Sequence, residues 1–214
     1  MEACEPIRNT GLRGVTIAST KISDVNGAEG KLVYRGYRAR DLAGKVCFEE
    51  VAYLLLFERL PGEAELTDFR RQIAEQREVP DNILNAMKAM PTDALPMDVL
   101  QATVAMMAAY DPEIREWHID STTRMAVRLI AKFATLAAAW DRIRTGKEPI
   151  APDPALSQAA NFLYMLNGEA PDDELAGFFD ACLVLHAEHS FNASTFAARE
   201  VASTKAHIYA AVPA

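Results

Sequence analysis

The spacing of hydrophobic residues predicts helices along most of the chain. From Phe48 onward apolar side chains recur at three- and four-residue steps, as at Leu66, Phe69 and Ile73, which is the period of one helix face. Proline and glycine residues interrupt this pattern at short intervals, and such residues commonly end helices. We predict about eight helices, near residues 48–60, 64–76, 80–90, 97–110, 120–145, 155–168, 171–190 and 192–212.

The N-terminal part has a different pattern. Residues 15–36 contain the β-branched stretch "VTIAST", the turn-forming cluster "DVNGAEG" and the alternating stretch "KLVYRG". This order predicts a β-hairpin whose turn is centred on Asn26 and Gly27. We therefore expect an all-α fold with a short N-terminal hairpin. Residues 1–46 would form the N-terminal segment, and residues 47–214 would form a packed helical domain.

Composition and charge narrow the function classes. Half of the residues are hydrophobic and the net charge is −8, so nothing attracts the chain generally to nucleic acid or anionic lipid. Three scattered cysteines argue against a disulfide framework. The acidic first residues do not resemble a signal peptide, and no apolar stretch is long enough to cross a bilayer. We expect a soluble, cytoplasmic protein without nucleic-acid or membrane partners.

The stretch "LHAEHSFNASTF", residues 185–196, is the main candidate for chemistry. His186 and His189 extend the spacing of Leu175, Phe178 and Cys182, so one helical stripe would end in two histidines. Two imidazoles one turn apart can point into one pocket, where each can donate or accept a proton near neutral pH.

Three interpretations of this pair remain open on the residues alone. Both histidines could be buried and satisfied by hydrogen bonds, with Asn192 as one partner. They could bind a metal, although the spacing differs from the zincin motif and no third ligand lies nearby. They could also bind a substrate or transfer protons.

Several segments together resemble the citrate synthase family, in its shorter bacterial and archaeal type. The resemblance lies in "GLRGVTIASTKISDVNGAEGKLVYRGY", "FEEVAYLLLFERLP", "LSQAANFLYMLNGEAPD" and "LHAEHSFNASTF" followed by "VAST". The last is similar to the family signature His-Ala-Asp-His-x-x-Asn-Ala-Ser-Thr-Phe. The resemblance covers essentially the whole chain in order, and implies the N-terminal part of the family's large helical domain.

The resemblance also implies an activity. Family members condense acetyl-CoA with oxaloacetate to give citrate and CoA in the tricarboxylic acid cycle, without a metal or other cofactor, and are homodimers. The second signature histidine binds oxaloacetate and corresponds to His189 here, while His186 and Asn192 match supporting positions. On this basis the metal interpretation is discarded.

Other family segments do not occur in these residues. In the family a Gly-Pro-Leu-His-Gly-Gly-Ala-Asn segment supplies the histidine that helps enolise acetyl-CoA, and a Gly-His-Arg segment supplies the histidine that polarises the oxaloacetate carbonyl. Both are absent here, as are the later arginines that bind its carboxylates. Leu95 replaces a histidine of the family pattern, and Ala134 a proline.

These differences lead to an expectation about activity. We expect these 214 residues alone to be inactive or nearly so, because such groups act as a unit, and to need a complementing chain or a further C-terminal region that supplies the rest. The alternatives are a non-catalytic truncated paralogue that binds a partner, and one half of a 2-methylcitrate synthase.

Overall fold

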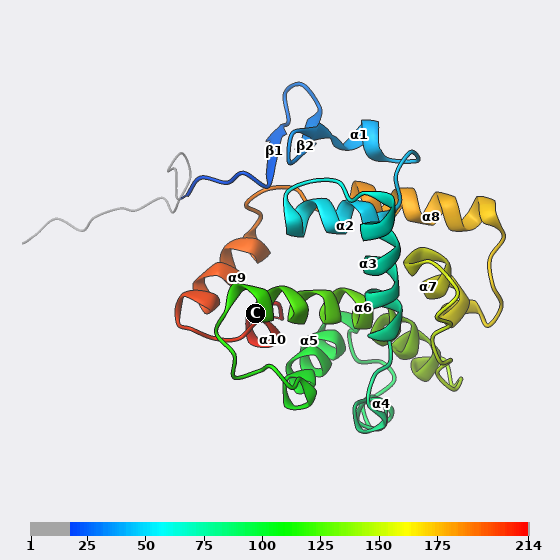
Figure 1. The fold of residues 1–214 in the computed structure, drawn as a ribbon. Helices are drawn as coiled ribbons and strands as arrows, with labels where there is room; N and C mark the ends of the chain where they lie inside the picture. The colour runs from blue at the N-terminus through cyan, green and yellow to red at the C-terminus, as the bar shows by residue number, and fades with distance from the viewer. Residues whose placement is uncertain (1–17, 214) are drawn as a thin grey trace, which may run out of the picture.

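The structure, a computed structural model, describes residues 18–213. Helices form most of this part, and a small antiparallel sheet with the order β1-β2-β3 lies at its N-terminal end (Figure 1). The predicted fold class, an all-α protein with an N-terminal hairpin, is confirmed. No helix in residues 18–213 is long and apolar enough to span a membrane.

The elements follow one another with short connections. Their bounds, in chain order, are β1 Ser23–Asn26, β2 Lys31–Tyr34, β3 Tyr37–Arg38, α1 Ala39–Leu42, α2 Phe48–Phe57, α3 Glu63–Glu75, α4 Asp81–Lys88, α5 Pro96–Met107, the 3₁₀ turn η1 Ala108–Tyr110, α6 Ile119–Arg144, α7 Gln158–Asn167, α8 Asp173–Leu185, α9 Ala193–Ser203 and α10 Ile208–Ala211.

The hairpin starts later than the sequence predicted. Strand β1 comprises residues 23–26, which include part of the expected turn, while residues 18–20 of the expected strand are not in a strand; residues 15–17 lie outside the described part. The Asn26 side chain explains the shift, because its Oδ1 accepts hydrogen bonds from the backbone N–H groups of Ala28 and Glu29, both at 3.1 Å. The turn therefore follows Asn26, with Gly30 in the left-handed region (φ +60°).

Helix α6, of 26 residues, runs through the middle of the molecule, and α5 and α7 pack on it (Figure 1). Its buried face contributes Met125, Leu129, Leu136 and Trp140 to the largest hydrophobic cluster of the described residues. Helices α4, α5 and α10 complete that cluster. These α6 positions are four, seven and four residues apart, so they lie on one face of the helix, and the helix predicted near residues 120–145 is confirmed.

The last predicted helix is divided in two. Helix α9 ends at Ser203, and α10 begins only at Ile208 after a turn in which Lys205 has φ +65°. His207, expected within a continuous helix, instead precedes α10 as its N-terminal cap residue. The break turns α10 towards α5 and α6, where Tyr209 is buried in the main cluster.

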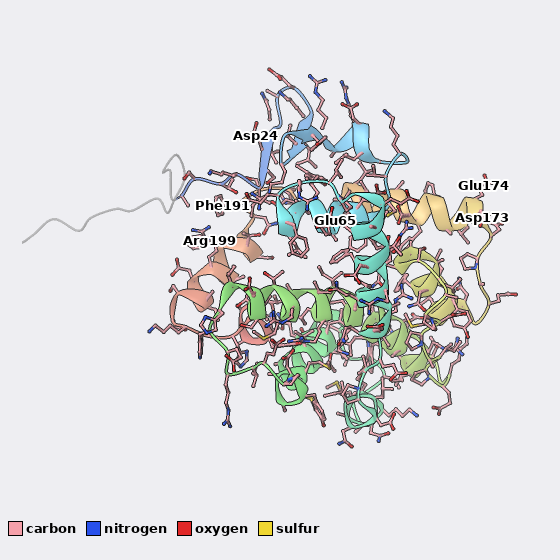
Figure 2. The ribbon with its side chains drawn as sticks, in the orientation of Figure 1. Asp24, Glu65, Asp173, Glu174, Phe191 and Arg199 are labelled. Atoms are coloured by element: carbon pink, nitrogen blue, oxygen red, sulfur yellow. The ribbon has the colours of Figure 1, made fainter. Side chains whose placement is uncertain are left out.

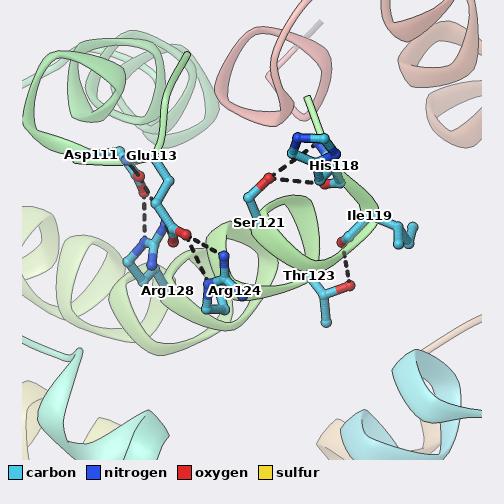
Figure 3. A network of polar contacts seen from close by, with 8 residues as sticks. All are labelled: Asp111, Glu113, His118, Ile119, Ser121, Thr123, Arg124 and Arg128. Carbon is cyan, nitrogen blue, oxygen red and sulfur yellow. Dashed lines mark hydrogen bonds and ion pairs between the residues drawn. The ribbon is translucent and has the colours of Figure 1, made fainter. Parts of the chain in front are cut away.

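A charged network fixes α10 to the centre of the molecule. Asp111, 7% exposed, accepts hydrogen bonds from Arg128 Nε (2.6 Å) and Nη2 (2.8 Å), and from the Tyr209 hydroxyl (2.6 Å). Arg128 also contacts Glu113 (Figure 3). Glu113 pairs in addition with Arg124, which lies one helical turn before Arg128 on α6. The connection after η1, helix α6 and helix α10 are thereby held together.

Candidate functional site

The histidine segment is a connection between two helices rather than the end of one. Helix α8 stops at Leu185, so His186 is its C-terminal cap and His189 lies beyond it. The His186 Nδ1 lies 2.7 Å from the Cys182 carbonyl oxygen. Because a carbonyl can only accept, Nδ1 carries the proton, and Nε2 is the nitrogen left for another partner.

The predicted histidine stripe on α8 is therefore wrong. Leu175 and Phe178, the first residues of the predicted stripe, are 46% and 69% exposed. The fully buried residue is Val184, which packs with the hairpin and α2. His186 and His189 do not continue one helical face, and both side chains are exposed, so the interpretation as a buried, satisfied pair is also wrong.

Two helix ends fix the segment that carries His189. On one side Tyr34 from β2 donates a hydrogen bond to the Leu185 carbonyl oxygen at 3.1 Å. On the other side Asn192 caps α9, accepting from the Thr195 backbone N–H at 2.7 Å. Asn192 was predicted to be a supporting residue, and this helix cap is its contact in the structure. His189 thus stands on a short connection whose ends are held by hydrogen bonds.

Between these ends, Glu188 is the central acceptor. Its Oε1 accepts from the Ser23 hydroxyl of β1 at 2.8 Å and from the backbone N–H of Ser190. The next aromatic residue, Phe191, lies under the Arg199 guanidinium, whose carbon is 4.8 Å from the ring centroid; Figure 2 labels both side chains. The segment is thus attached to the hairpin and to α9.

Ser23 and Tyr34 belong to this site, although the sequence does not indicate it. Ser23 and Tyr34 are direct cross-strand partners in the hairpin and lie more than 150 residues before the segment they contact. No local pattern could have related them to the histidines. Glu188 lies between the two histidines, and the sequence alone gives it no role.

A metal site is not assembled in the described part. No group of three or more histidine, cysteine, aspartate or glutamate side chains gathers within residues 18–213 in a way that could hold an ion. The exposed imidazole of His189 can form hydrogen bonds, and this suits recognition of a polar or anionic molecule.

The Asn192 cap gives a testable contribution to stability. Replacing Asn192 by alanine is expected to lower the free energy of unfolding by about 1 kcal/mol, because the N–H of Thr195 loses its acceptor. Replacement by serine keeps a capping oxygen and is expected to retain most of that stability. Urea denaturation of both variants checks this; equal losses for alanine and serine would contradict a capping role.

The chain belongs to the citrate synthase family: the family model described as "Citrate synthase, C-terminal domain" matches residues 11–214. It is similar to the citrate synthase of Acidithiobacillus ferridurans, with 43% identity over 213 residues, covering 96% of this chain and 54% of that protein. The 2-methylcitrate synthase of Mycobacterium tuberculosis (strain H37Rv) is 41% identical over 202 residues, covering 94% and 51%.

Solved structures agree with this assignment. The crystal structure of citrate synthase from Pyrobaculum aerophilum matches with a TM-score of 0.90 and 39% identity, over 95% of this chain and 53% of that one. The chain spans about half the length of the curated relatives that it matches. The family predicted from the signature segments is confirmed.

Proposed function

We propose that this chain supplies the oxaloacetate-binding side of a citrate synthase site. The observation that supports this is the placement of His189: its side chain is exposed, on a short segment held by the hairpin, by α8 and by the capped end of α9. In this proposal His189 binds oxaloacetate, and His186 and Asn192 are supporting residues. Oxaloacetate and acetyl-CoA are the substrates, and no metal or other cofactor takes part.

The chemistry suits an imidazole. An N–H of His189 can donate a hydrogen bond to an oxygen of an anionic keto-acid and so fix its orientation. The complete reaction forms a carbon–carbon bond between the acetyl methyl carbon and the keto carbon. Water then cleaves the thioester to release citrate and CoA. The complete reaction also needs a base that removes a proton from the acetyl methyl group and a hydrogen-bond donor that stabilises the developing alkoxide.

The base and the donor would come from outside these 214 residues. The sequence contains neither the Gly-Pro-Leu-His-Gly-Gly-Ala-Asn nor the Gly-His-Arg segment. We therefore expect the chain to bind oxaloacetate weakly and to catalyse nothing measurable until a complementing chain is added. Assembly as a homodimer or with such a chain fits the exposed apolar residues Leu95 and Met97, which are 66% and 65% exposed.

Two measurements test this function. Oxaloacetate is titrated into the isotope-labelled chain, and NMR follows the backbone amide signals of residues 185–196, which the variants retain. The shifts are expected to saturate, and a His189→Ala variant should bind at least about tenfold more weakly. His118→Ala is the matched control, because His118 is also exposed but lies before α6. Equal affinity in the wild-type and His189→Ala chains would contradict the proposal.

The second measurement is CoA release from acetyl-CoA and oxaloacetate by the chain alone. We expect no release above background. Robust release would contradict the need for a complementing chain while leaving His189 binding intact.

A second candidate is condensation of propionyl-CoA, as in a 2-methylcitrate synthase. It is supported by the 41% identity to the Mycobacterium tuberculosis protein of that name. One methylene changes binding by only about 1–3 kcal/mol, so a complemented enzyme should be assayed with both thioesters. Activity with neither, despite a bound complementing chain, would favour the third candidate, a non-catalytic partner-binding subunit.

A further inference from the structure

We propose that Glu188 is a positioning residue, which uses the N-terminal hairpin to fix the direction in which His189 points. The inference rests on the proposed function of His189 and deepens it. It concerns the carboxylate that directly precedes the histidine in sequence and bonds to the hairpin.

The first observation is that one oxygen of Glu188 has two donors from different parts of the chain. Oε1 accepts from the Ser23 hydroxyl, 165 residues earlier, and from the backbone N–H of Ser190, two residues later. Ser23 is only 9% exposed, so this contact lies at the buried side of the segment. Hydrogen bonds to an ionised acceptor are about twice as strong as neutral ones.

The second observation is that one pair of facing residues in the hairpin bonds to two positions of the histidine segment. Ser23 and Tyr34 are directly paired across β1 and β2, and side chains of directly paired residues lie on the same face of a sheet. Ser23 bonds Glu188, and Tyr34 bonds the Leu185 carbonyl oxygen at 3.1 Å. Tyr34 is completely buried, so the surrounding core holds this residue pair in place.

The third observation is the backbone of Ser190. Its φ is +74°, in the left-handed region that non-glycine residues rarely adopt and that costs about 1–3 kcal/mol. The hydrogen bond from its N–H to Glu188 stabilises this conformation. The Ser190 carbonyl oxygen accepts in turn from the Asn192 N–H at 2.9 Å, which continues the turn into α9.

Together these contacts determine where His189 points. The residues on both sides of it are fixed, Glu188 by its side chain and Ser190 by its backbone, so the intervening Cα–Cβ direction is fixed as well. The hairpin, which carries no reacting group in the proposed function, then acts on substrate binding through Glu188. Glu188 itself has no role as an acid or base in this proposal.

Amide hydrogen exchange of the 214-residue chain tests the contact without any ligand. In Glu188→Ala the Ser190 N–H should exchange about 10- to 100-fold faster, as expected for loss of a hydrogen bond to a charged acceptor. Glu188→Gln keeps an oxygen that can accept from both donors and should retain most of the protection. Ser23→Ala should show an intermediate loss. Glu200→Ala, a change of an exposed glutamate on α9, is the matched control.

Oxaloacetate titration of the same variants tests the positioning role. We expect affinity to fall about tenfold in Glu188→Ala and to recover in Glu188→Gln, with melting temperatures recorded to confirm folding. Unchanged Ser190 exchange in Glu188→Ala would overturn the contact. Faster exchange with unchanged affinity, while His189→Ala loses binding, would overturn the positioning role alone. If His189→Ala binds normally, the proposed function fails, and the exchange data still decide whether the contact exists.

Discussion

Replacing Asp111 by alanine is expected to lower the free energy of unfolding by about 3 kcal/mol, because the mostly buried charge of Arg128 keeps only Glu113 as an acidic partner among the described residues. The guanidinium of Arg128, whose side chain is 14% exposed, would lose both of its hydrogen bonds to Asp111. The Tyr209 hydroxyl would lose its acceptor at the same time. Urea denaturation measures the change directly.

A surface ion pair provides the control. Arg71 pairs with Asp68 and Glu75 on the exposed face of α3, so Arg71→Ala should cost no more than about 1 kcal/mol. If the Asp111 and Arg71 variants lose similar amounts of stability, the contacts of Asp111 with Arg128 and Tyr209 do not hold α10 in the way described; Figure 3 shows the Asp111–Arg128 part of these contacts.

The same carboxylate predicts how stability depends on pH. Burial alone would raise the pKa of Asp111, but hydrogen bonds from Arg128 and Tyr209 outweigh burial and hold the pKa below its usual range. A lowered pKa in the folded state stabilises the protein above the unfolded pKa of about 3.9, and this stability is lost as the pH falls through the folded pKa. We therefore expect the wild type to lose stability below about pH 4 more steeply than Asp111→Asn.

Replacing Trp140 by alanine should cost a further large amount, about 3–5 kcal/mol. Trp140 is 2% exposed and belongs to the main cluster around α6, so the change would remove a large aromatic side chain and leave a cavity. Trp117, 60% exposed, offers the matched comparison, and Trp117→Ala should change stability by no more than about 0.5 kcal/mol. Similar losses in the two variants would contradict this account of the core.

The indole nitrogen of Trp140 refines the prediction. Its Nε1 is buried and has no hydrogen-bond partner among residues 18–213. An unpaired buried donor is itself destabilising by about 1–3 kcal/mol. Trp140→Phe removes this donor and keeps an aromatic ring, so thermal denaturation should show a much smaller loss than for alanine.

The helical part of the fold was predictable because its causes are local. The period of apolar residues located α6, and Pro96 and Asp172 stand at the starts of α5 and α8 as such residues commonly do. Asp172 accepts from the Leu175 backbone N–H at 2.8 Å, a contact within one helical turn. Nothing beyond neighbouring residues is needed for these starts.

The end of α8 could not be predicted in the same way. The pattern of Leu175, Phe178 and Cys182 continues to His186 and His189, and nothing in it marks Leu185 as the last helical residue. At Leu185 and Glu188 the chain bonds to the hairpin residues Tyr34 and Ser23, which lie far away in the sequence. A local pattern does not contain these contacts. The family signature placed the two histidines in one site, but the contacts of Glu188 appear only in three dimensions.

The contacts between the hairpin and the histidine segment have a consequence for how the protein is made. The bond from Ser23 to Glu188 joins residues separated by 165 positions, and that from Tyr34 to Leu185 joins residues separated by 151. Closing so long a loop costs chain entropy, and contacts of this kind form late because intervening elements must collapse first. During synthesis Ser23 is made 165 residues before Glu188, so the hairpin cannot form this contact until the intervening helices have been synthesised. We therefore expect the segment that carries His189 to become ordered after the helical core, so the surface around His189 forms later than the helices that support it.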